Sequence, residues 1–256
     1  MTKYVILSLF IITLTLKALG KDLSLANSFS DGIVLQREKP INVWGHAGPG
    51  QPVTLKFGEE KKITKANSKG QWSLKIGPLM ASSEPRTMTI NSGKSELRIA
   101  DILVGEVWVC GGQSNMAWTM RGSTNADIEI SAANFPEIRF LKLPNVASPR
   151  EQDDFPLGKP TDWIGKWQRA VTPEVQNCSA VAYYFARRLH RQLKVPVGII
   201  ENSWGGTMAQ HWCNKNTLKQ IPEMVEDIKK FDDTYQTWID GGKEAGAQKR
   251  LAQDIA

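Results

Sequence analysis

The fold is decided by residues 106–116, which read Glu106-Val107-Trp108-Val109-Cys110-Gly111-Gly112-Gln113-Ser114-Asn115-Met116. The apolar, β-prone run over residues 107–110 is typical of a buried strand. Gly111 and Gly112 permit backbone angles that other residues avoid, so the chain can turn sharply after this strand. We therefore predict a strand that runs into a tight turn, with Ser114 at the tip of the turn where a helix could begin.

Ser114 would occupy a position that suits a nucleophile. At the first turn of a helix the backbone N–H groups are free, and the helix dipole presents its positive end. A serine there can attack a carbonyl group while such N–H groups stabilise the oxyanion that forms. For a single serine after a glycine pair, simple helix capping is the better interpretation. The longer string Gly112-Gln113-Ser114-Asn115-Met116 is more specific and favours the nucleophile.

A second stretch repeats this pattern. Residues 195–207 form a β-prone run that ends in Gly205-Gly206-Thr207. Between the two stretches, residues 178–193 carry apolar side chains at helical spacing, with Ser179 as the cap. Strand, helix and strand in this order predict parallel strands in a doubly wound sheet, whose ligand sites lie at the carboxyl ends of the strands. A lone Gly-Gly would be an ordinary turn, but as the second such turn it is expected to share a site with Ser114.

The chain before residue 104 has a different pattern. Apolar residues alternate with polar ones in short runs, separated by turn signals such as Gly48-Pro49-Gly50 and Asn91-Ser92-Gly93. Strands at this regular spacing predict a small antiparallel sandwich, which could pack on the following domain, bind carbohydrate, or both. The apolar positions that carry this prediction are Val53, Leu55, Phe57, Trp72, Leu74, Ile76, Met88, Ile90, Leu97 and Ile99.

The two glycine turns resemble the first two conserved blocks of the SGNH hydrolases, in the form found in sialate O-acetylesterases and in carbohydrate esterase family six. The resemblance implies a serine esterase that removes O-acetyl groups from sugars, with sialic acids as the expected substrate class. Ser114 would form an acyl-enzyme, and no cofactor would be needed. Gly206, or as second choice Gly205, would join the N–H of Ser114 in the oxyanion hole. Gln113 and Asn115 match the first block and are expected neighbours of the site, without an assigned role.

The resemblance also implies a multidomain β plus α/β architecture. Residues 21–103 would form the small antiparallel β-sandwich. Residues 104–256 would form the N-terminal part of a flavodoxin-like SGNH hydrolase fold, an α/β/α arrangement with a parallel sheet. Within it, the proline-bearing residues 145–176 are expected to be a surface connection, which Trp163 and Trp167 attach to the core. The polar, helix-prone residues 217–256 resemble the family's helical insertion.

The residue that would activate Ser114 is not visible in the sequence. The histidines are His46, His190 and His211, and none has an aspartate two or three residues before it, as the family's base block does. We therefore expect these residues to be the N-terminal part of a longer esterase. The alternative is an inactive, truncated fragment that serves at most as a carbohydrate-binding or structural protein. An α/β-hydrolase lipase is a weaker third interpretation, because Ser114 does not lie in a Gly-x-Ser-x-Gly sequence.

Composition and the first residues bear on partners and location. The formal charge of +6 comes from scattered basic residues, which argues against nucleic-acid binding. Residues 1–20 have the basic start, apolar core and small residues of a signal peptide, so we expect export to the periplasm or outside the cell, without stable membrane insertion after cleavage. Cys178 and Cys213 could form a disulfide. No Cys-x-x-Cys or clustered set of His, Cys and Asp residues supports a metal site.

Overall fold

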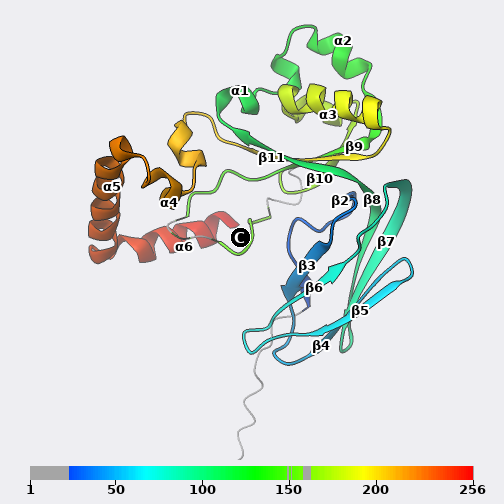
Figure 1. Cartoon of the computed structure of the whole chain (residues 1–256), viewed down its shortest axis with the longest axis horizontal. Helices are drawn as coiled ribbons and strands as arrows, with labels where there is room; N and C mark the ends of the chain where they lie inside the picture. The colour runs from blue at the N-terminus through cyan, green and yellow to red at the C-terminus, as the bar shows by residue number, and fades with distance from the viewer. Residues whose placement is uncertain (1–22, 149, 151, 158–162, 256) are drawn as a thin grey trace, which may run out of the picture.

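The chain folds around two β-sheets (Figure 1). The computed structural model describes residues 23–148, 150, 152–157 and 163–255. An antiparallel three-stranded sheet has the order β1-β3-β6, and a mixed eight-stranded sheet has the order β10-β9-β11-β8-β7-β4-β5, with β2 paired to β8. The protein is therefore a mixed α/β chain. The expected signal peptide over residues 1–20 lies outside the described residues.

The small sheet consists of β1 (Ser24–Leu25), β3 (Ile41–His46) and β6 (Gln71–Ile76), all paired antiparallel. One face of this sheet supplies buried residues to the core, among them Val43 and Trp72. The other face carries Asn42, Trp44 and polar side chains that remain accessible. This alternation is what the period-two pattern of the sequence predicts for a sheet with one covered face.

The large sheet begins with antiparallel strands and continues with parallel ones. Strands β8, β9 and β11 are parallel neighbours, as the strand–helix–strand pattern predicts. The expectation of a parallel sheet was incomplete, because β10 pairs antiparallel with β9 inside the stretch expected to be a surface connection. The strands are β2 (Val34–Gln36), β4 (Pro52–Phe57), β5 (Glu60–Lys65), β7 (Ser82–Ser92), β8 (Ser95–Gly112), β9 (Asn134–Lys142), β10 (Trp167–Val171) and β11 (Val197–Ser203).

Strand β8 joins the two halves of the molecule. It is one strand of 18 residues, whose first part pairs antiparallel with β7 and whose last part pairs parallel with β11. The boundary expected between residues 103 and 104 falls within this strand. Consequently one sheet extends through both predicted domains. Strand β8 connects the N-terminal strands directly to the turn that carries Ser114.

Two hydrophobic cores lie on opposite sides of the parallel strands. In Figure 1, α1 (Ser114–Ala117) and α3 (Ala180–Leu193) cover one face, and β3 and β6 lie beyond the other. Helix α3 packs through Ala182, Tyr183 and Ala186, which are fully buried. Val181 and Phe185, two of the apolar side chains at helical spacing, are instead exposed. The small side chains of Ala182 and Ala186 let the helix backbone approach the sheet closely.

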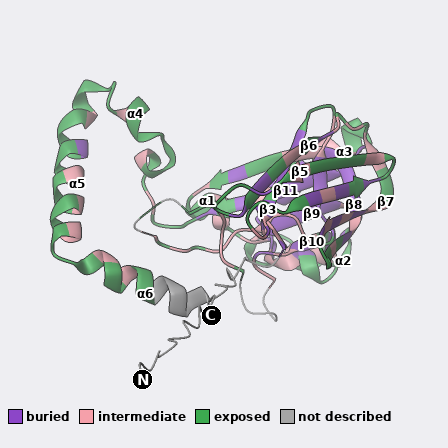
Figure 2. Cartoon of the chain, turned by 90° about the horizontal axis from the view of Figure 1, so that it is seen from below, coloured by how far each residue is buried: buried purple, intermediate pink, exposed green. Residues whose placement is uncertain are grey.

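The remaining helices are short or project from the body of the molecule. Figures 1 and 2 show α5 and α6 extending away from the sheets, with largely exposed surfaces. On α5, Ile228 is buried but Phe231 is exposed, so the apolar side chains of this helix are only partly covered. Among the described residues, no helix is both long and apolar enough to cross a membrane. The bounds are α2 (Ala126–Ser131), α4 (Lys215–Leu218), α5 (Pro222–Asp240) and α6 (Lys243–Ile255), with short 3₁₀ helices at Met120–Gly122, Glu174–Asn177 and Ala209–Trp212.

Candidate active site

Ser114 lies at the first position of α1, directly beyond the end of β8. Gln113 is the residue that caps this helix, and its Oε1 atom accepts hydrogen bonds from the backbone nitrogen of Ser114 at 3.2 Å and from Ser114 Oγ at 2.9 Å. The Ser114 side chain is exposed. Gln113 thus holds the hydroxyl of Ser114 in the structure, a role that the sequence had left open.

The second glycine turn lies beside Ser114. Ser203, the last residue of β11, pairs with Gly112, and the backbone nitrogen of Trp204 donates to the Gly112 carbonyl at 2.9 Å. A Cβ atom built on Gly205 would lie 3.5 Å from Ser114 Oγ. The two turns, about ninety residues apart in sequence, therefore meet at the carboxyl ends of adjacent parallel strands.

Glycine is required at two of these positions for conformational reasons. Gly206 has a φ angle of +80°, and Gly112 has a φ angle of +149°. A side chain is strained in this part of conformational space, whereas glycine is not. No atom lies within 4 Å of the position that a Cβ atom on Gly206 would take, so the space beside this residue is open. A substrate can reach the backbone there.

Aromatic side chains border the two turns. Trp118 follows α1, Trp204 precedes Gly205, and the ring of Trp212 lies 3.6 Å from the Cβ position of Gly111. All three tryptophans are exposed. Asn115 is exposed too, and no hydrogen bond of its side chain is found in the described part of the chain. The surface beside Ser114 is therefore open and partly apolar.

None of the three histidines is hydrogen-bonded to Ser114 within the described residues. His211 uses Nδ1 to accept a hydrogen bond from the backbone of Met208 at 3.2 Å, where it caps a short 3₁₀ helix. The Nδ1 atom of His190 lies 2.8 Å from the Val195 carbonyl oxygen at the end of α3. His46 belongs to β3 in the small sheet.

A buried charged network lies under the second glycine turn, and sequence reasoning missed it. Glu201 on β11 is fully buried, and its Oε1 atom lies 3.0 Å from the Nζ atom of Lys142. The carboxylate also accepts hydrogen bonds from Ser203 Oγ at 3.1 Å and from the backbone nitrogen of Ser179 at 3.0 Å. It thereby ties the end of β11 to β9 and to the start of α3. The signal in the sequence was a single acidic residue directly after the apolar first half of the strand.

This network affects two of the three cysteines, all of which are free. Burial raises the pKa of the Cys110 thiol, and the nearby Glu201 charge raises it further. Burial also raises the pKa of the Cys178 thiol, more strongly than that of Cys110, and the negative charge of Glu201 adds to this increase. Cys213 is exposed, and the disulfide with Cys178 considered from the sequence is not formed. Within the described ranges, no group of three or more His, Cys, Asp or Glu residues could hold a metal ion.

The fold and the site define a mixed α/β protein whose candidate site lies at the carboxyl edge of parallel strands.

No family model matches the chain. The chain is 30% identical to mouse sialate O-acetylesterase over 227 residues, covering 82% of this chain and 41% of that protein. It is 30% identical to human sialate O-acetylesterase over 219 residues, covering 79% of this chain and 41% of that protein.

A solved structure agrees with these sequence matches. The crystal structure of a carbohydrate acetylesterase from Xanthomonas citri matches with a TM-score of 0.69 and 31% identity, covering 76% of this chain and 43% of that chain. The chain belongs to the sialate O-acetylesterase family. It spans about two fifths of the length of the curated relatives that it matches.

Proposed function

We propose that the chain supplies the nucleophile and the oxyanion hole of a serine esterase that removes O-acetyl groups from carbohydrates, with acetylated sialic acids as the substrate class. The observation that carries this proposal is the short distance from Ser114 Oγ to the position of a Cβ atom on Gly205, 3.5 Å. A reacting carbonyl placed between these residues would meet a hydroxyl nucleophile and backbone N–H donors together. The names of the relatives support the acetyl ester as substrate.

Each residue has a distinct role in this proposal. Ser114 Oγ attacks the acetyl carbonyl, and the acetyl group remains on Ser114 until water removes it. The backbone N–H groups of Ser114 and Gly206, with Gly205 as second choice, donate to the oxyanion. Because the Ser114 N–H donates to Gln113 Oε1 in the free protein, the Gln113 side chain must rotate away when substrate binds.

The reaction also needs a base that takes the proton from Ser114 Oγ. We propose that this base lies outside the described residues. A second candidate function, that of a non-catalytic binding protein, is favoured by one observation. In the described structure Ser114 Oγ donates to Gln113, and no histidine is hydrogen-bonded to it.

A comparison of variants distinguishes these two functions. Hydrolysis of 4-nitrophenyl acetate and release of acetate from an O-acetylated sialic acid are measured for the wild type and for Ser114→Ala, with imidazole added as an external base. Ser68→Ala is a matched control, because Ser68 is exposed and lies in a turn of the N-terminal strands. The esterase proposal expects a loss of activity in Ser114→Ala alone. Equal rates in all three proteins would favour the binding protein.

We also propose that the protein is exported to the periplasm or outside the cell. The proposal rests on residues 1–20, whose basic start and apolar core are typical of a signal peptide. Expression of the full chain in a bacterial host, followed by cell fractionation and N-terminal sequencing, tests it. A mature N-terminus near residue 21 in the exported fraction is expected. An intact N-terminus in the cytoplasmic fraction would contradict the proposal.

A further inference from the structure

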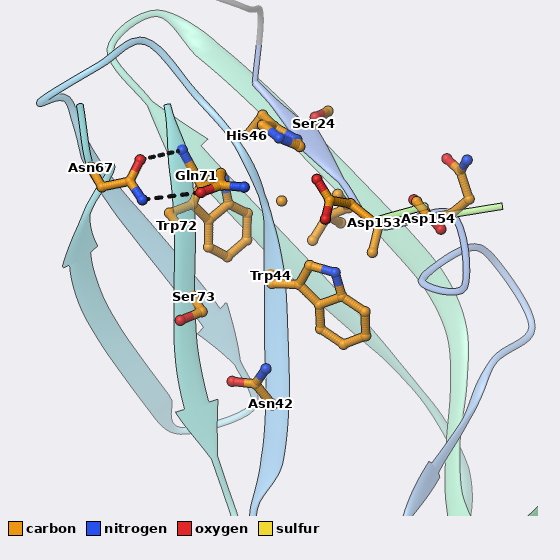
Figure 3. A pocket seen from close by; sticks show the side chains of 14 residues that line it. Ser24, Asn42, Trp44, His46, Asn67, Gln71, Trp72, Ser73, Asp153 and Asp154 are labelled. Atoms are coloured by element: carbon orange, nitrogen blue, oxygen red, sulfur yellow. Dashed lines mark hydrogen bonds between the residues drawn. The ribbon is translucent and has the colours of Figure 1, made fainter. Parts of the chain in front are cut away.

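The outer face of the small sheet carries a groove that the candidate active site does not use. Its volume is about 590 Å³, and residues of β1, β3 and β6 form its floor. Within the sheet, Trp44 pairs with Ser73, and His46 pairs with Gln71. Because side chains alternate along strands, these four project together from the face opposite the core. Figure 3 shows their side chains gathered over the strands.

Trp44 provides a fixed aromatic surface at one end of this groove. Its ring packs edge-on against Phe29, with the two ring centroids 5.2 Å apart and an interplanar angle of 88°. The Trp44 side chain nevertheless remains 38% exposed. A large apolar ring that is held in place and left accessible can stack on an apolar ligand face at little entropic cost.

A loop that follows the C-terminal end of β9 forms one wall of the groove, beside Trp44 (Figure 3). Asp153 and Asp154 line the groove, and Asp154 Oδ2 accepts a hydrogen bond from the backbone nitrogen of Asn27 at 2.6 Å. The Asn27 side chain donates in turn to the Phe155 carbonyl at 2.6 Å. These two bonds fix the loop beside β1. Asp153 is exposed and has no hydrogen bond or ion pair within the described part of the chain.

The remaining polar groups are arranged as unused donors and acceptors. Gln71 Oε1 accepts a hydrogen bond from Asn67 Nδ2 at 3.2 Å, which orients the Gln71 amide and leaves its Nε2 donor available. The side chains of Asn42, His46 and Ser73 also form no hydrogen bonds among the described residues. Amide, imidazole, hydroxyl and carboxylate groups around an aromatic ring can hydrogen-bond to many hydroxyl groups at once.

The charged residues that line the groove favour neutral ligands over anionic ones. Its lining contains two aspartates and no lysine or arginine. Anionic ligands such as phosphates, nucleic acids and sialic acids would therefore meet like charges without a compensating cation. A neutral saccharide offers what the groove can bind, since it has an apolar ring face for Trp44 and hydroxyl groups for the polar rim.

We propose that this groove is a non-catalytic binding site for neutral saccharides. It is separate from the candidate active site, because β9 and β11 lie between α1 and the small sheet in Figure 1. The site would hold the neutral part of a glycan, or a neutral polysaccharide, on the protein while Ser114 is free to act elsewhere. This binding does not depend on the esterase chemistry.

The test measures binding by isothermal titration calorimetry. The probes are neutral hexasaccharides of xylose, glucose, mannose and N-acetylglucosamine, with sialyllactose as the anionic comparison. We expect at least one neutral probe to bind and sialyllactose not to bind at the groove. Trp44→Ala should weaken the binding at least about tenfold, and Trp44→Phe should restore much of it. Trp238→Ala is the matched control, since Trp238 lies on the projecting helix α5.

Two further variants protect the test against simple misfolding. Asp153→Ala removes an exposed side chain without structural partners, and Ser73→Arg places bulk beside Trp44 on the sheet face. Both should weaken binding while thermal melting stays unchanged. Ser114→Ala should bind as the wild type does, which separates this site from the esterase site. Absence of binding by every neutral probe, or binding that Trp44→Ala, Asp153→Ala and Ser73→Arg all leave intact, would overturn the proposal. Binding of sialyllactose alone would overturn it as well.

Discussion

Ser114 Oγ lies 3.5 Å from the position that a Cβ atom on Gly205 would occupy. This distance joins two turns that are far apart in sequence but end neighbouring parallel strands. A methyl group at Gly205 would make ordinary van der Waals contact with the serine without a clash. In the mechanism that we propose, it would fill the space in which the tetrahedral oxyanion forms.

The first prediction follows from this contact. Gly205→Ala should melt close to the wild-type temperature, because the new methyl group meets no atom closer than 3.5 Å. The part of the esterase rate that depends on Ser114 should fall by about 10²-fold or more, as when an oxyanion-hole donor is lost. Melting curves and initial rates with 4-nitrophenyl acetate measure the two effects. A variant that keeps its rate would show that the oxyanion does not lie beside Gly205.

The second prediction concerns the buried carboxylate of Glu201. Glu201→Ala leaves Lys142 without its partner and should destabilise the protein by about 3–5 kcal/mol, as expected for a broken buried ion pair. Urea unfolding measures this change. Adding Lys142→Met to Glu201→Ala should restore part of the lost stability, because no unpaired charge then remains. Additive losses in the double variant would contradict the pairing.

The third prediction is a pH dependence at Asp101. Hydrogen bonds from the Arg139 guanidinium, and then from Arg169, hold the pKa of Asp101 below its usual range. A carboxyl group with a lowered folded-state pKa contributes stability above its unfolded pKa, about 3.9, and this contribution is lost as the pH falls through the folded-state pKa. Asp101→Asn should therefore unfold more easily at neutral pH and lose less stability on acidification than the wild type.

Asparagine suits this test because Asp101 has a φ angle of +56°, which asparagine tolerates well. Glu84→Gln provides the control, since the exposed Glu84 carboxyl forms no ion pair among the described residues. Urea unfolding curves at a series of acidic and neutral pH values measure both variants. If Asp101→Asn followed the wild-type pH profile, Asp101 would not be the responsible group.

The fourth prediction concerns thiol reactivity. Cys213 is exposed, whereas Cys110 and Cys178 are buried with raised pKa values. Because the thiolate is the reactive form, a disulfide reagent added at pH 8 should modify Cys213 quickly and the other two only after unfolding. Titration of released thiolate, followed by peptide mapping, locates the modified residue. Rapid modification of Cys110 in the folded protein would contradict the buried position of that side chain.

The fifth prediction concerns the open edge of the large sheet. The last part of β8 pairs with β11 on one side, and Val109 and Trp108 on this strand are exposed. An unpaired edge with apolar side chains promotes association between chains. We expect poor solubility, and Val109→Lys should reduce self-association. Sedimentation velocity at several concentrations measures it. A monodisperse wild-type sample that melts cooperatively would contradict this expectation.

The sequence predicted most strands because alternation of apolar and polar residues directly encodes a sheet with one buried face. It also predicted both glycine turns, since their conformations demand glycine locally. The spacing of apolar residues predicted α3 but not which of them are buried, since Ala182 and Ala186 are buried whereas Val181 and Phe185 are exposed. Strand β10 was missed because its pairing with β9 depends on tertiary context rather than on a local pattern.

The candidate site was predicted less completely than the fold. The sequence indicated Ser114, Gly205 and Gly206, and the structure brings the two turns together. The hydrogen bond from Ser114 Oγ to Gln113 depends on the rotamer of the Gln113 side chain, and a sequence does not specify a rotamer. The Glu201–Lys142 pair joins separate strands, so neither residue alone indicated the network.

The most direct test of the central claim is acetylation of Ser114 itself. The protein is incubated with 4-nitrophenyl acetate, with imidazole added as an external base, and the acetylated residue is located by mass spectrometry of peptides. We expect an acetyl group on Ser114 in the wild type, with slower acetylation in Gly205→Ala and none at this position in Ser114→Ala. An unmodified Ser114, with acetyl groups only on surface lysines, would contradict the claim that Ser114 is the nucleophile.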